Sequence, residues 1–156
     1  MTRSVRALRD GDRTWVGEVI RERWGSPIAV AHGDVYEPAA LPGFVAEDDG
    51  RPVGLLTYHV RGDACEIVTI DAFDERRGVG SALVEAVAAL GYERLWLVTT
   101  NDNVGAQRFY ERLGFRLVAV REGELERSRR LKPEIPEVAE DGTPIRDELE
   151  YERRGR

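Results

Sequence analysis

The sequence is poor in the residues that form disulfides, metal sites and basic surfaces. It has one cysteine, Cys65, and two histidines among 156 residues. This excludes an internal disulfide and leaves few ligands for a zinc site, so we expect no metal. Lysine occurs once, and 23 basic side chains are outnumbered by 29 acidic ones, for a net charge of −6. A nucleic-acid-binding protein needs a basic footprint, so we expect no nucleic-acid partner.

Long apolar runs are missing as well. No stretch approaches the ~20 apolar residues that a membrane-spanning helix needs. The first residues lead into a charged segment without the apolar core of a signal peptide. We therefore expect no membrane partner and a cytoplasmic location. Hydrophobic residues make up 42% of the chain, which is enough for one core, and the length suits a single domain over residues 1–156.

The first half of the chain predicts one helix and an antiparallel meander. The helix begins after Asp10 or Asp12, either of which could cap it, and ends at Gly25. Residues 28–43 contain glycines and prolines, so we expect a loop or a broken helix there. Short strands are predicted over residues 5–8, 44–46, 53–60 and 64–73, with an Asp-Gly turn between the second and the third.

The second half alternates between helices and strands. Residues 79–90 are apolar almost all round and predict a buried helix, and 95–98 predict a strand covered on both faces. A helix capped by Asn101 or Asp102 runs to a left-handed residue at Gly114 and precedes a strand over 115–120. The predicted fold class is α/β, with a mixed, mostly antiparallel sheet of six or seven strands and helices on both faces.

The C-terminal segment, residues 121–156, extends this 1–120 core. Residues 122–131 predict a charged helix, and alternation over 145–151 predicts a final edge strand. Its Arg and Glu residues are most simply a solvated face; the alternative is that the whole segment is an interaction tail. An edge strand at this end would make a homodimer reasonable.

The most informative segment is the turn from Asp74 to Leu83, between a predicted strand and the buried helix. Gly78 and Gly80 allow a tight turn that exposes consecutive backbone N–H groups at the positive end of a helix. Such a turn can hold a pyrophosphate, although it also occurs as a plain strand-to-helix connection. The P-loop lysine is missing, and Leu83 stands where a dinucleotide fingerprint has a small residue.

A second segment sharpens this signal. Asn103, Ala106 and Tyr110, followed by Gly114-Phe115, come after Arg77-Gly78-Val79-Gly80 in the chain. With these segments the chain resembles the GNAT superfamily of N-acetyltransferases, over roughly residues 3–120 and most specifically over 64–115. Glu75 departs from the pattern, since the family often has Gln or Arg there, and one phosphate donor is thereby missing.

The resemblance implies acetyl-CoA as co-substrate and a sheet that splays at its fourth and fifth strands. The pantetheine arm would enter that gap, and the N–H of Ile70 would donate to the thioester oxygen. The coenzyme-binding residues implied by the family pattern are Thr69, Ile70, Arg76, Arg77, Gly78, Val79, Gly80, Ser81, Asn103 and Ala106.

Two residues are candidates for catalysis. Tyr110 is expected to be the general acid, because a phenol of pKa ~10 can protonate a departing thiolate whose thiol has a pKa near ~8.5; alternatively it is a core aromatic. Glu66 lies in Cys65-Glu66-Ile67-Val68, which resembles the Ala-Glu-Ile-Val of histone-acetylating relatives, where Glu is the base. Strand alternation predicts that Glu66 shares one sheet face with Val68 and Ile70. The alternatives are an exposed edge carboxylate and a water relay.

Other polar residues carry less weight. His59 is expected to be structural, and Cys65 has no histidine partner for a thiol mechanism. His32, Tyr36 and Trp24 lie in or beside the 25–43 segment, which in this superfamily usually shapes the acceptor site. The resemblance therefore implies an N-acetyltransferase that moves acetyl from acetyl-CoA to an amine-bearing small molecule or peptide, by direct attack in a ternary complex. The alternative is a non-catalytic acyl-CoA-binding or sensing module.

Overall fold

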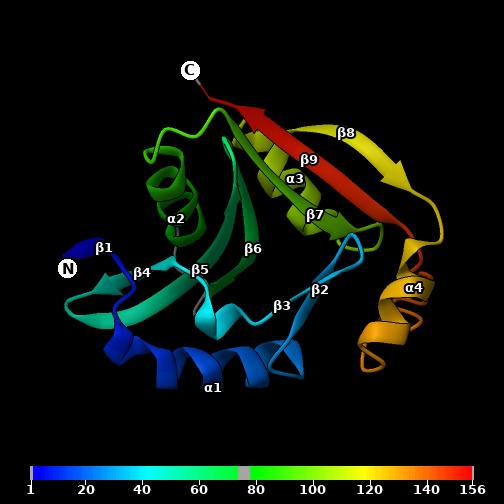
Figure 1. Ribbon diagram of the computed structural model, residues 1–156, viewed down its shortest axis with the longest axis horizontal. Coiled ribbons are helices and arrows are strands. Elements are labelled where there is room, and N and C mark those ends of the chain that lie inside the picture. Colours follow the sequence, from blue (N-terminus) through cyan, green and yellow to red (C-terminus); the bar gives the residue numbers. More distant parts are fainter. Residues whose placement is uncertain (1, 74–77, 156) are drawn as a thin grey trace.

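The computed structural model describes residues 2–73 and 78–155 (Figure 1). Within them, seven strands form one sheet in the order β1-β4-β5-β6-β7-β9-β8, and β2 and β3 pair separately. The strands are β1 (Arg3–Ala7), β2 (Ala29–Ala31), β3 (Asp34–Tyr36), β4 (Gly43–Asp48), β5 (Arg51–Arg61), β6 (Ala64–Ala72), β7 (Arg94–Thr100), β8 (Arg116–Arg121) and β9 (Glu148–Arg154). The helices are α1 (Arg13–Trp24), α2 (Val79–Ala88), α3 (Val104–Arg112) and α4 (Glu124–Leu131). None of these described helices is long and apolar enough to cross a membrane.

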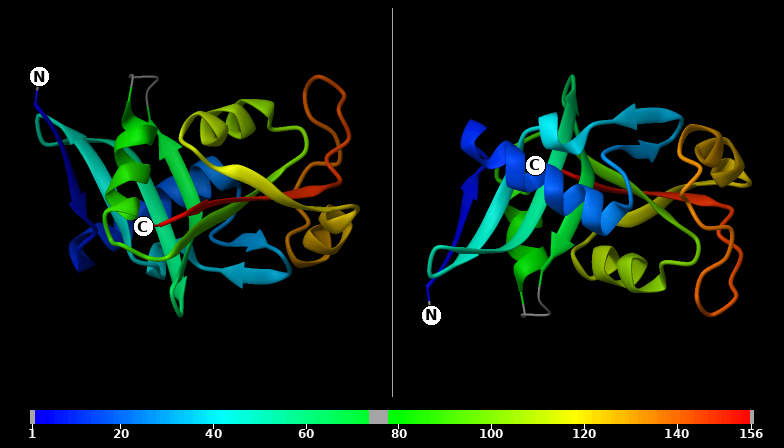
Figure 2. Two further views of the ribbon diagram at one scale, coloured as in Figure 1. Left: turned by 90° about the horizontal axis from the view of Figure 1, so that it is seen from above. Right: turned by 90° about the horizontal axis from the view of Figure 1, so that it is seen from below.

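The sheet has helices on both faces, as predicted (Figure 2). Leu55 and Leu56 of β5 are both fully buried but point to opposite faces, because strand side chains alternate. Leu55 packs with α1, whereas Leu56 belongs to the larger core with α2 and α3. Burial of each large apolar side chain of α2 contributes ~1.5–3 kcal/mol, so this helix is anchored firmly over the sheet.

Within the segment predicted as a loop or broken helix, residues 29–36 instead form a β-hairpin of β2 and β3, whereas Pro38–Ala40 is a single 3-10 turn. His32 and Gly33 connect the strands, and both have positive φ, 43° and 85°. Two left-handed residues in a two-residue loop make a type I′ turn, whose twist matches that of paired strands. The sequence prediction was wrong because histidine is an uncommon first residue for this turn, which usually begins with Asn, Asp or Gly.

The predicted helix caps also need correction. Asp12 precedes α1, but its carboxylate accepts hydrogen bonds from Arg6, the Arg9 N–H and the Trp15 indole. It therefore ties β1 to the helix start. At α3 the cap is Asn103, whose side chain accepts from the Ala106 N–H at 3.1 Å; Asn101 and Asp102 lie too early in the chain.

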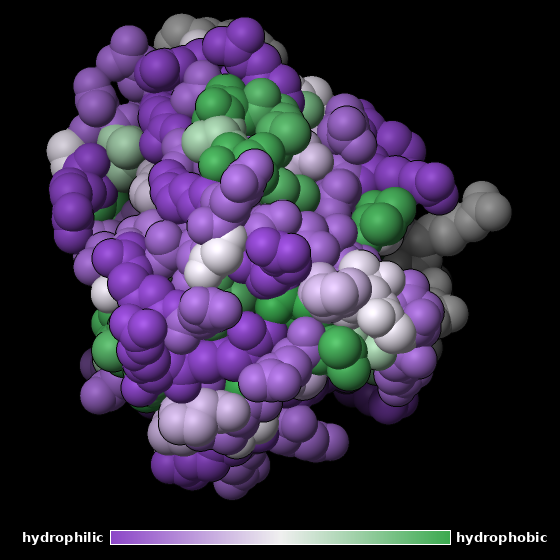
Figure 3. All heavy atoms as spheres, turned by 90° about the vertical axis from the view of Figure 1, so that its right-hand side faces the viewer, coloured by the Kyte–Doolittle hydropathy of each residue, from purple (hydrophilic) through white to green (hydrophobic). Residues whose placement is uncertain are grey.

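The last strand is not at the edge of the sheet. β9 lies between β7 and β8, antiparallel to both, so β8 is the outer strand. The argument for a dimer through a C-terminal edge strand therefore no longer holds. Glu148, Glu150 and Glu152 are buried rather than solvated, and they pair with Arg94 and Arg121 on the neighbouring strands. The outer surface on the α4 side is mostly hydrophilic (Figure 3).

Candidate functional site

An opening passes through the sheet where β6 and β7 diverge. The two parallel strands pair from Ala64–Glu66 to Arg94–Trp96 and then separate. Cavities of about 360 and 190 Å³ follow this opening. Trp24 of α1 lines both from one face of the sheet, and Ala106 and Tyr110 of α3 line the larger one from the other. A long, thin ligand could therefore cross from one face to the other.

A β-bulge in β6 sets which side chains face each way. Thr57 pairs with Thr69 and Tyr58 pairs with Ile67, so Val68 is the extra residue. Ile70 consequently packs with Ile67 in the larger core, while Glu66 points to the opposite face. The prediction that Glu66 and Ile70 share a face is wrong, because strict alternation does not survive an inserted residue.

The backbone of β6 presents free polar groups to the opening. Phe73 donates its N–H to the Val53 carbonyl on β5. Since N–H groups alternate along a strand, those of Asp71 and Thr69 also face β5, whereas that of Ile70 faces the opening. The Thr69 side chain is buried and its hydroxyl lies 2.7 Å from that of Thr57. Of the two predicted strand residues, Ile70 therefore presents its amide to the opening and Thr69 does not.

The glycine turn leads directly into α2. Gly78 has a φ of +83° and precedes the helix, and among the described residues no side chain caps it. The first-turn N–H groups of Val79, Gly80 and Ser81 therefore have no partner within the helix. A Cβ at Gly80 would lie 2.9 Å from the Phe109 ring, so this glycine allows α2 to pack closely on α3. The predicted Arg76 and Arg77 lie outside the described residues.

The predicted residues of α3 meet at the opening. Asn103 caps the helix and lines both cavities, and Ala106 and Tyr110 follow on the same side. Tyr110 is buried between the rings of Phe109 and Phe115, with centroids 5.2 and 5.5 Å away. Burial, together with the charge of Asp71, raises the pKa of Tyr110. The phenol is thus both a core aromatic and a protonated group at the opening.

Glu66 is buried at the point where β6 and β7 separate, with 2% of its surface exposed. Tyr36 donates its hydroxyl to Glu66 Oε1 at 2.7 Å, and His32 Nε2 lies 2.9 Å from Oε2 and 3.1 Å from Oε1. Both partners come from the β2–β3 hairpin. Glu66 is therefore not an exposed edge carboxylate but the centre of a polar cluster.

A further cavity of about 280 Å³ lies on the hairpin side of Glu66. Its walls include the rings of His32, Tyr36, His59 and Trp96. Glu66 lines this cavity as well as the smaller one in the opening. The carboxylate therefore stands between the opening and a second, aromatic-walled compartment large enough for a small group.

The family resemblance placed His32 and Tyr36 near the acceptor site, but the sequence reasoning did not pair them with Glu66. His32 and Tyr36 stand in the segment expected to be irregular, and Glu148, which accepts the His32 N–H at 2.9 Å, was assigned to a solvated face. The available signal was the spacing around His32-Gly33: apolar residues at 29 and 31, then Tyr36. A glycine at the second turn position with alternation on both sides is a hairpin pattern.

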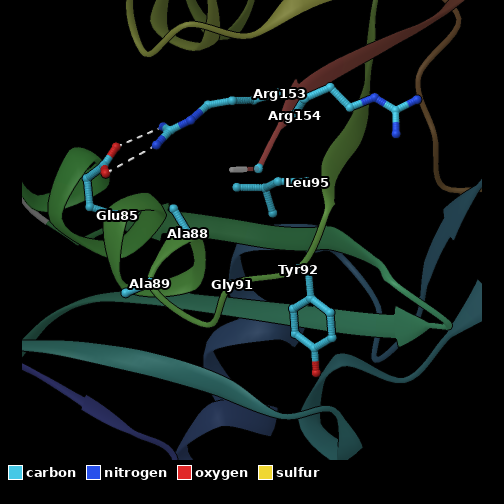
Figure 4. A pocket seen from close by; sticks show the side chains of 9 residues that line it. Glu85, Ala88, Ala89, Gly91, Tyr92, Leu95, Arg153 and Arg154 are labelled. Atoms are coloured by element: carbon cyan, nitrogen blue, oxygen red, sulfur yellow. Dashed lines mark hydrogen bonds and ion pairs between the residues drawn. The ribbon is translucent and has the colours of Figure 1, made fainter.

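A larger cavity, about 540 Å³, lies away from this cluster (Figure 4). It is lined by the end of α2, the start of β7 and the C-terminal residues. Arg153 crosses it to pair with Glu85, and Tyr92 points away from that pair. Among its described lining residues none also lines the opening between β6 and β7. Across residues 2–73 and 78–155 no cluster of His, Cys, Asp and Glu could hold a metal ion.

Comparison with known proteins agrees with this architecture. Uncharacterized protein YdhI of Bacillus subtilis (strain 168) is 39% identical over 137 residues, which cover 85% of this chain and 86% of that protein. Uncharacterized protein YxbD of the same strain is 40% identical over 139 residues, which cover 86% of this chain and 87% of that protein. The crystal structure of a GNAT family acetyltransferase from Elizabethkingia anophelis with acetyl-CoA bound is 16% identical and superposes with a TM-score of 0.69 over 97% of each chain. The sequence profile of the acetyltransferase (GNAT) family matches residues 10–115. The chain belongs to the acetyltransferase (GNAT) family.

Proposed function

We propose that the protein transfers an acetyl group from acetyl-CoA to an amine, by direct attack within a ternary complex. The observation that carries this proposal is the opening through the sheet, with Glu66 on one face and Tyr110 on the other. Acyl transfer to an amine needs a base that removes a proton from the ammonium, so that the neutral amine can attack, and a proton donor for the leaving thiolate. The two side chains supply one of each, on opposite sides of one channel.

Acetyl-CoA fits the backbone features of the site. Its pyrophosphate would accept hydrogen bonds from the first-turn N–H groups of α2, where the helix dipole also favours an anion. Its pantetheine arm would run along the free edge of β6 and into the opening. The N–H of Ile70 would then donate to the thioester oxygen, on which negative charge builds during attack. Asn103 and Ala106 would form the wall on the α3 side.

Tyr110 would protonate the sulfur that leaves. The phenol is protonated at neutral pH, and its raised pKa makes it a weaker acid, so it would hydrogen-bond to the sulfur and give up the proton only as the thiolate forms. Burial among aromatic rings also excludes water, which strengthens the interaction between a phenol and a developing thiolate. The residue thus combines a fixed position with the correct protonation state.

Glu66 would accept the proton of the ammonium. Its Oε1 is already engaged by Tyr36, while Oε2 contacts His32 alone among the hydrogen bonds found in the described residues. Oε2 therefore retains a lone pair for the acceptor. An amine in the smaller cavity of the opening would meet this carboxylate before reaching the thioester.

Direct attack is favoured over a thiol intermediate by the state of Cys65. The thiol is fully buried in the larger core, and burial raises its pKa to about 12. A nucleophilic cysteine needs a lowered pKa and access to the substrate. Cys65 has the opposite of both properties.

The acceptor would be a small molecule or a peptide with a free amine. Glu66 and Glu148 both line the cavity nearest the opening, and a pair of carboxylates attracts an ammonium group. The two carboxylates favour a cationic acceptor, but they do not distinguish between amines that differ elsewhere in their structure.

The test is a panel of amines incubated with acetyl-CoA, with released CoA and acetylated product both measured. Polyamines, aminoglycosides and peptides with free N-termini form the panel. We expect binding of acetyl-CoA by calorimetry and product from at least one amine. Binding without product from any amine would support a sensing module instead, and no binding at all would contradict the proposal.

A further inference from the structure

His32 occupies the centre of the Glu66 cluster and connects it to solvent. Its Nε2 lies 2.9 Å from Glu66 Oε2, and its Nδ1 lies 3.3 Å from Asp34 Oδ2. Side-chain exposure rises along this series, from 2% for Glu66 through 16% for His32 to 48% for Asp34. The three groups therefore form a continuous path from the interior to water.

We propose that His32 is a positioning residue that orients Glu66 and passes the proton taken up by Glu66 to Asp34 and solvent. This inference rests on the proposed function, because it concerns the proton that the amine loses. A buried base needs such an exit, since each turnover delivers one proton to a carboxylate with almost no contact with water.

The position of the imidazole is fixed by a backbone hydrogen bond, by ring packing and by the conformation of the turn. The His32 N–H donates to the Glu148 carboxylate, and the His32 ring lies on Trp96 with centroids 5.0 Å apart. The backbone is left-handed at φ 43°, a conformation that costs a non-glycine residue ~1–2 kcal/mol. Because a type I′ turn requires a left-handed residue at this position, the hairpin itself fixes where the ring leaves the backbone.

The surroundings of His32 are mainly acidic. Burial opposes its charged form, but the hydrogen bond to Glu66 and the charges of Glu66, Asp34 and Glu148 raise its pKa above the ordinary value. Arg127 of α4 lies against the neighbouring Gly33. The other titratable and charged groups around this cluster are Tyr36, His59, Arg61, Arg94, Arg121 and Glu124.

These contacts define the proton path. Before turnover the imidazole is neutral, with its proton on Nδ1, which lies 3.3 Å from Asp34 Oδ2, and with the lone pair of Nε2 facing Glu66 Oε2. When Glu66 Oε2 accepts a proton from the ammonium, it passes that proton to Nε2, and the imidazolium so formed releases Nδ1–H to Asp34. The ring, now protonated at Nε2, regains the Nδ1 tautomer by proton exchange with water before the next turnover. Asp34 then loses its proton to water, so one proton leaves the amine and one enters the solvent. Tyr36 donates to Glu66 throughout, because its pKa is raised by burial and by Glu66.

The first test is chemical rescue. His32→Gly suits the left-handed turn and leaves a space for imidazole beside Glu66. With the best amine of the panel, we expect kcat to fall at least about tenfold, KM for acetyl-CoA to stay unchanged, and added imidazole to restore kcat with a pH dependence set by imidazole. His59→Gly, in the same cavity, should show no rescue. Full activity of His32→Gly, or a loss that imidazole never restores in a folded variant, would overturn the relay.

The second test needs no acceptor. In protein labelled with ¹⁵N-histidine, the pH at which the His32 ring loses a proton should fall in Glu66→Gln and in Asp34→Asn, because each variant removes a negative charge beside the ring. An unchanged titration of His32 in both variants would contradict the inference. Failure of every amine to react would instead count against the proposed function, so the two failures are distinguishable.

Discussion

The opening between β6 and β7 and the Glu66 cluster are neighbours, yet they are built in different ways. The opening is made of backbone edges and small or apolar side chains, and its shape follows from where two strands stop pairing. The cluster is made of charged side chains brought together over long separations, with His32 and Glu66 34 residues apart and His32 and Glu148 116 apart. Under the proposed function, the backbone groups of the opening would bind the co-substrate, whereas the side chains of the cluster would bind the acceptor and take its proton.

The largest effect is expected at Glu66. Glu66→Gln keeps the size of the side chain and an acceptor for the Tyr36 hydroxyl but removes the proton acceptor. We expect kcat with the best amine to fall by about 10²–10⁴-fold, with acetyl-CoA affinity unchanged, measured by steady-state kinetics and calorimetry. Glu85→Gln, at the exposed ion pair beside α2, is the matched control. Equal activities of the two variants would remove Glu66 from the mechanism.

Tyr110→Phe comes second. It keeps the buried ring and deletes only the hydroxyl, so turnover should drop by about 10²-fold, the lower end for general acid catalysis, because a thiolate is already a good leaving group. Binding of acetyl-CoA should persist. Tyr92→Phe, in the separate cavity beside Arg153, serves as the control. Unchanged turnover in Tyr110→Phe would leave the residue with a packing role alone.

Ser81→Glu tests the part of the site that is formed by backbone N–H groups. A carboxylate in the first turn of α2 should stabilise the helix by ~0.3–1 kcal/mol through its dipole, while it repels the pyrophosphate. We expect acetyl-CoA affinity to fall about tenfold with no loss of thermal stability, whereas Ser81→Ala should change neither much. Equal affinity in the Glu and Ala variants would show that the phosphates bind elsewhere.

The smallest effect is a pH dependence of stability at the cluster. The folded-state pKa of His32 is raised, so its contribution is complete below the unfolded-state pKa of ~6.5 and is lost as pH rises through the folded-state value. The free energy of unfolding of the wild type relative to His32→Gln should therefore decline over that window. Denaturant titrations at several pH values measure this difference. If the difference in unfolding free energy grew with pH instead, the folded-state pKa of His32 would be lowered rather than raised, which would contradict the account.

The two regions also differ in how far the sequence predicts them. The strand-turn-helix around Gly78 and the stripe of α3 are local patterns, so the order of elements could be predicted from residue types. The resemblance to the GNAT family then supplied the coenzyme segment and the candidates Glu66 and Tyr110. The bulge at Val68 has no local mark, and it reversed the face assigned to Ile70. The insertion of β9 between β7 and β8 likewise depends on pairing across the whole chain.

The charged C-terminal strand shows the same limit. Glu148, Glu150 and Glu152 alternate with Leu149 and Tyr151, which indicates a strand with one polar face. The polar face of a strand is normally exposed. Here β9 lies between β7 and β8, and arginines of these two strands pair with the glutamates. Periodicity identifies the element, whereas burial of its polar side is decided by partners elsewhere in the chain.

The most direct measurement is an amide NMR titration of the ¹⁵N-labelled protein with CoA. If the coenzyme crosses the sheet between β6 and β7, the largest shifts should fall on Ile70 and on Val79, Gly80 and Ser81, while the amides of Tyr92 and Gly155 at the larger cavity stay unchanged. Shifts confined to the cavity beside Arg153, or spread evenly over the surface, would contradict the account.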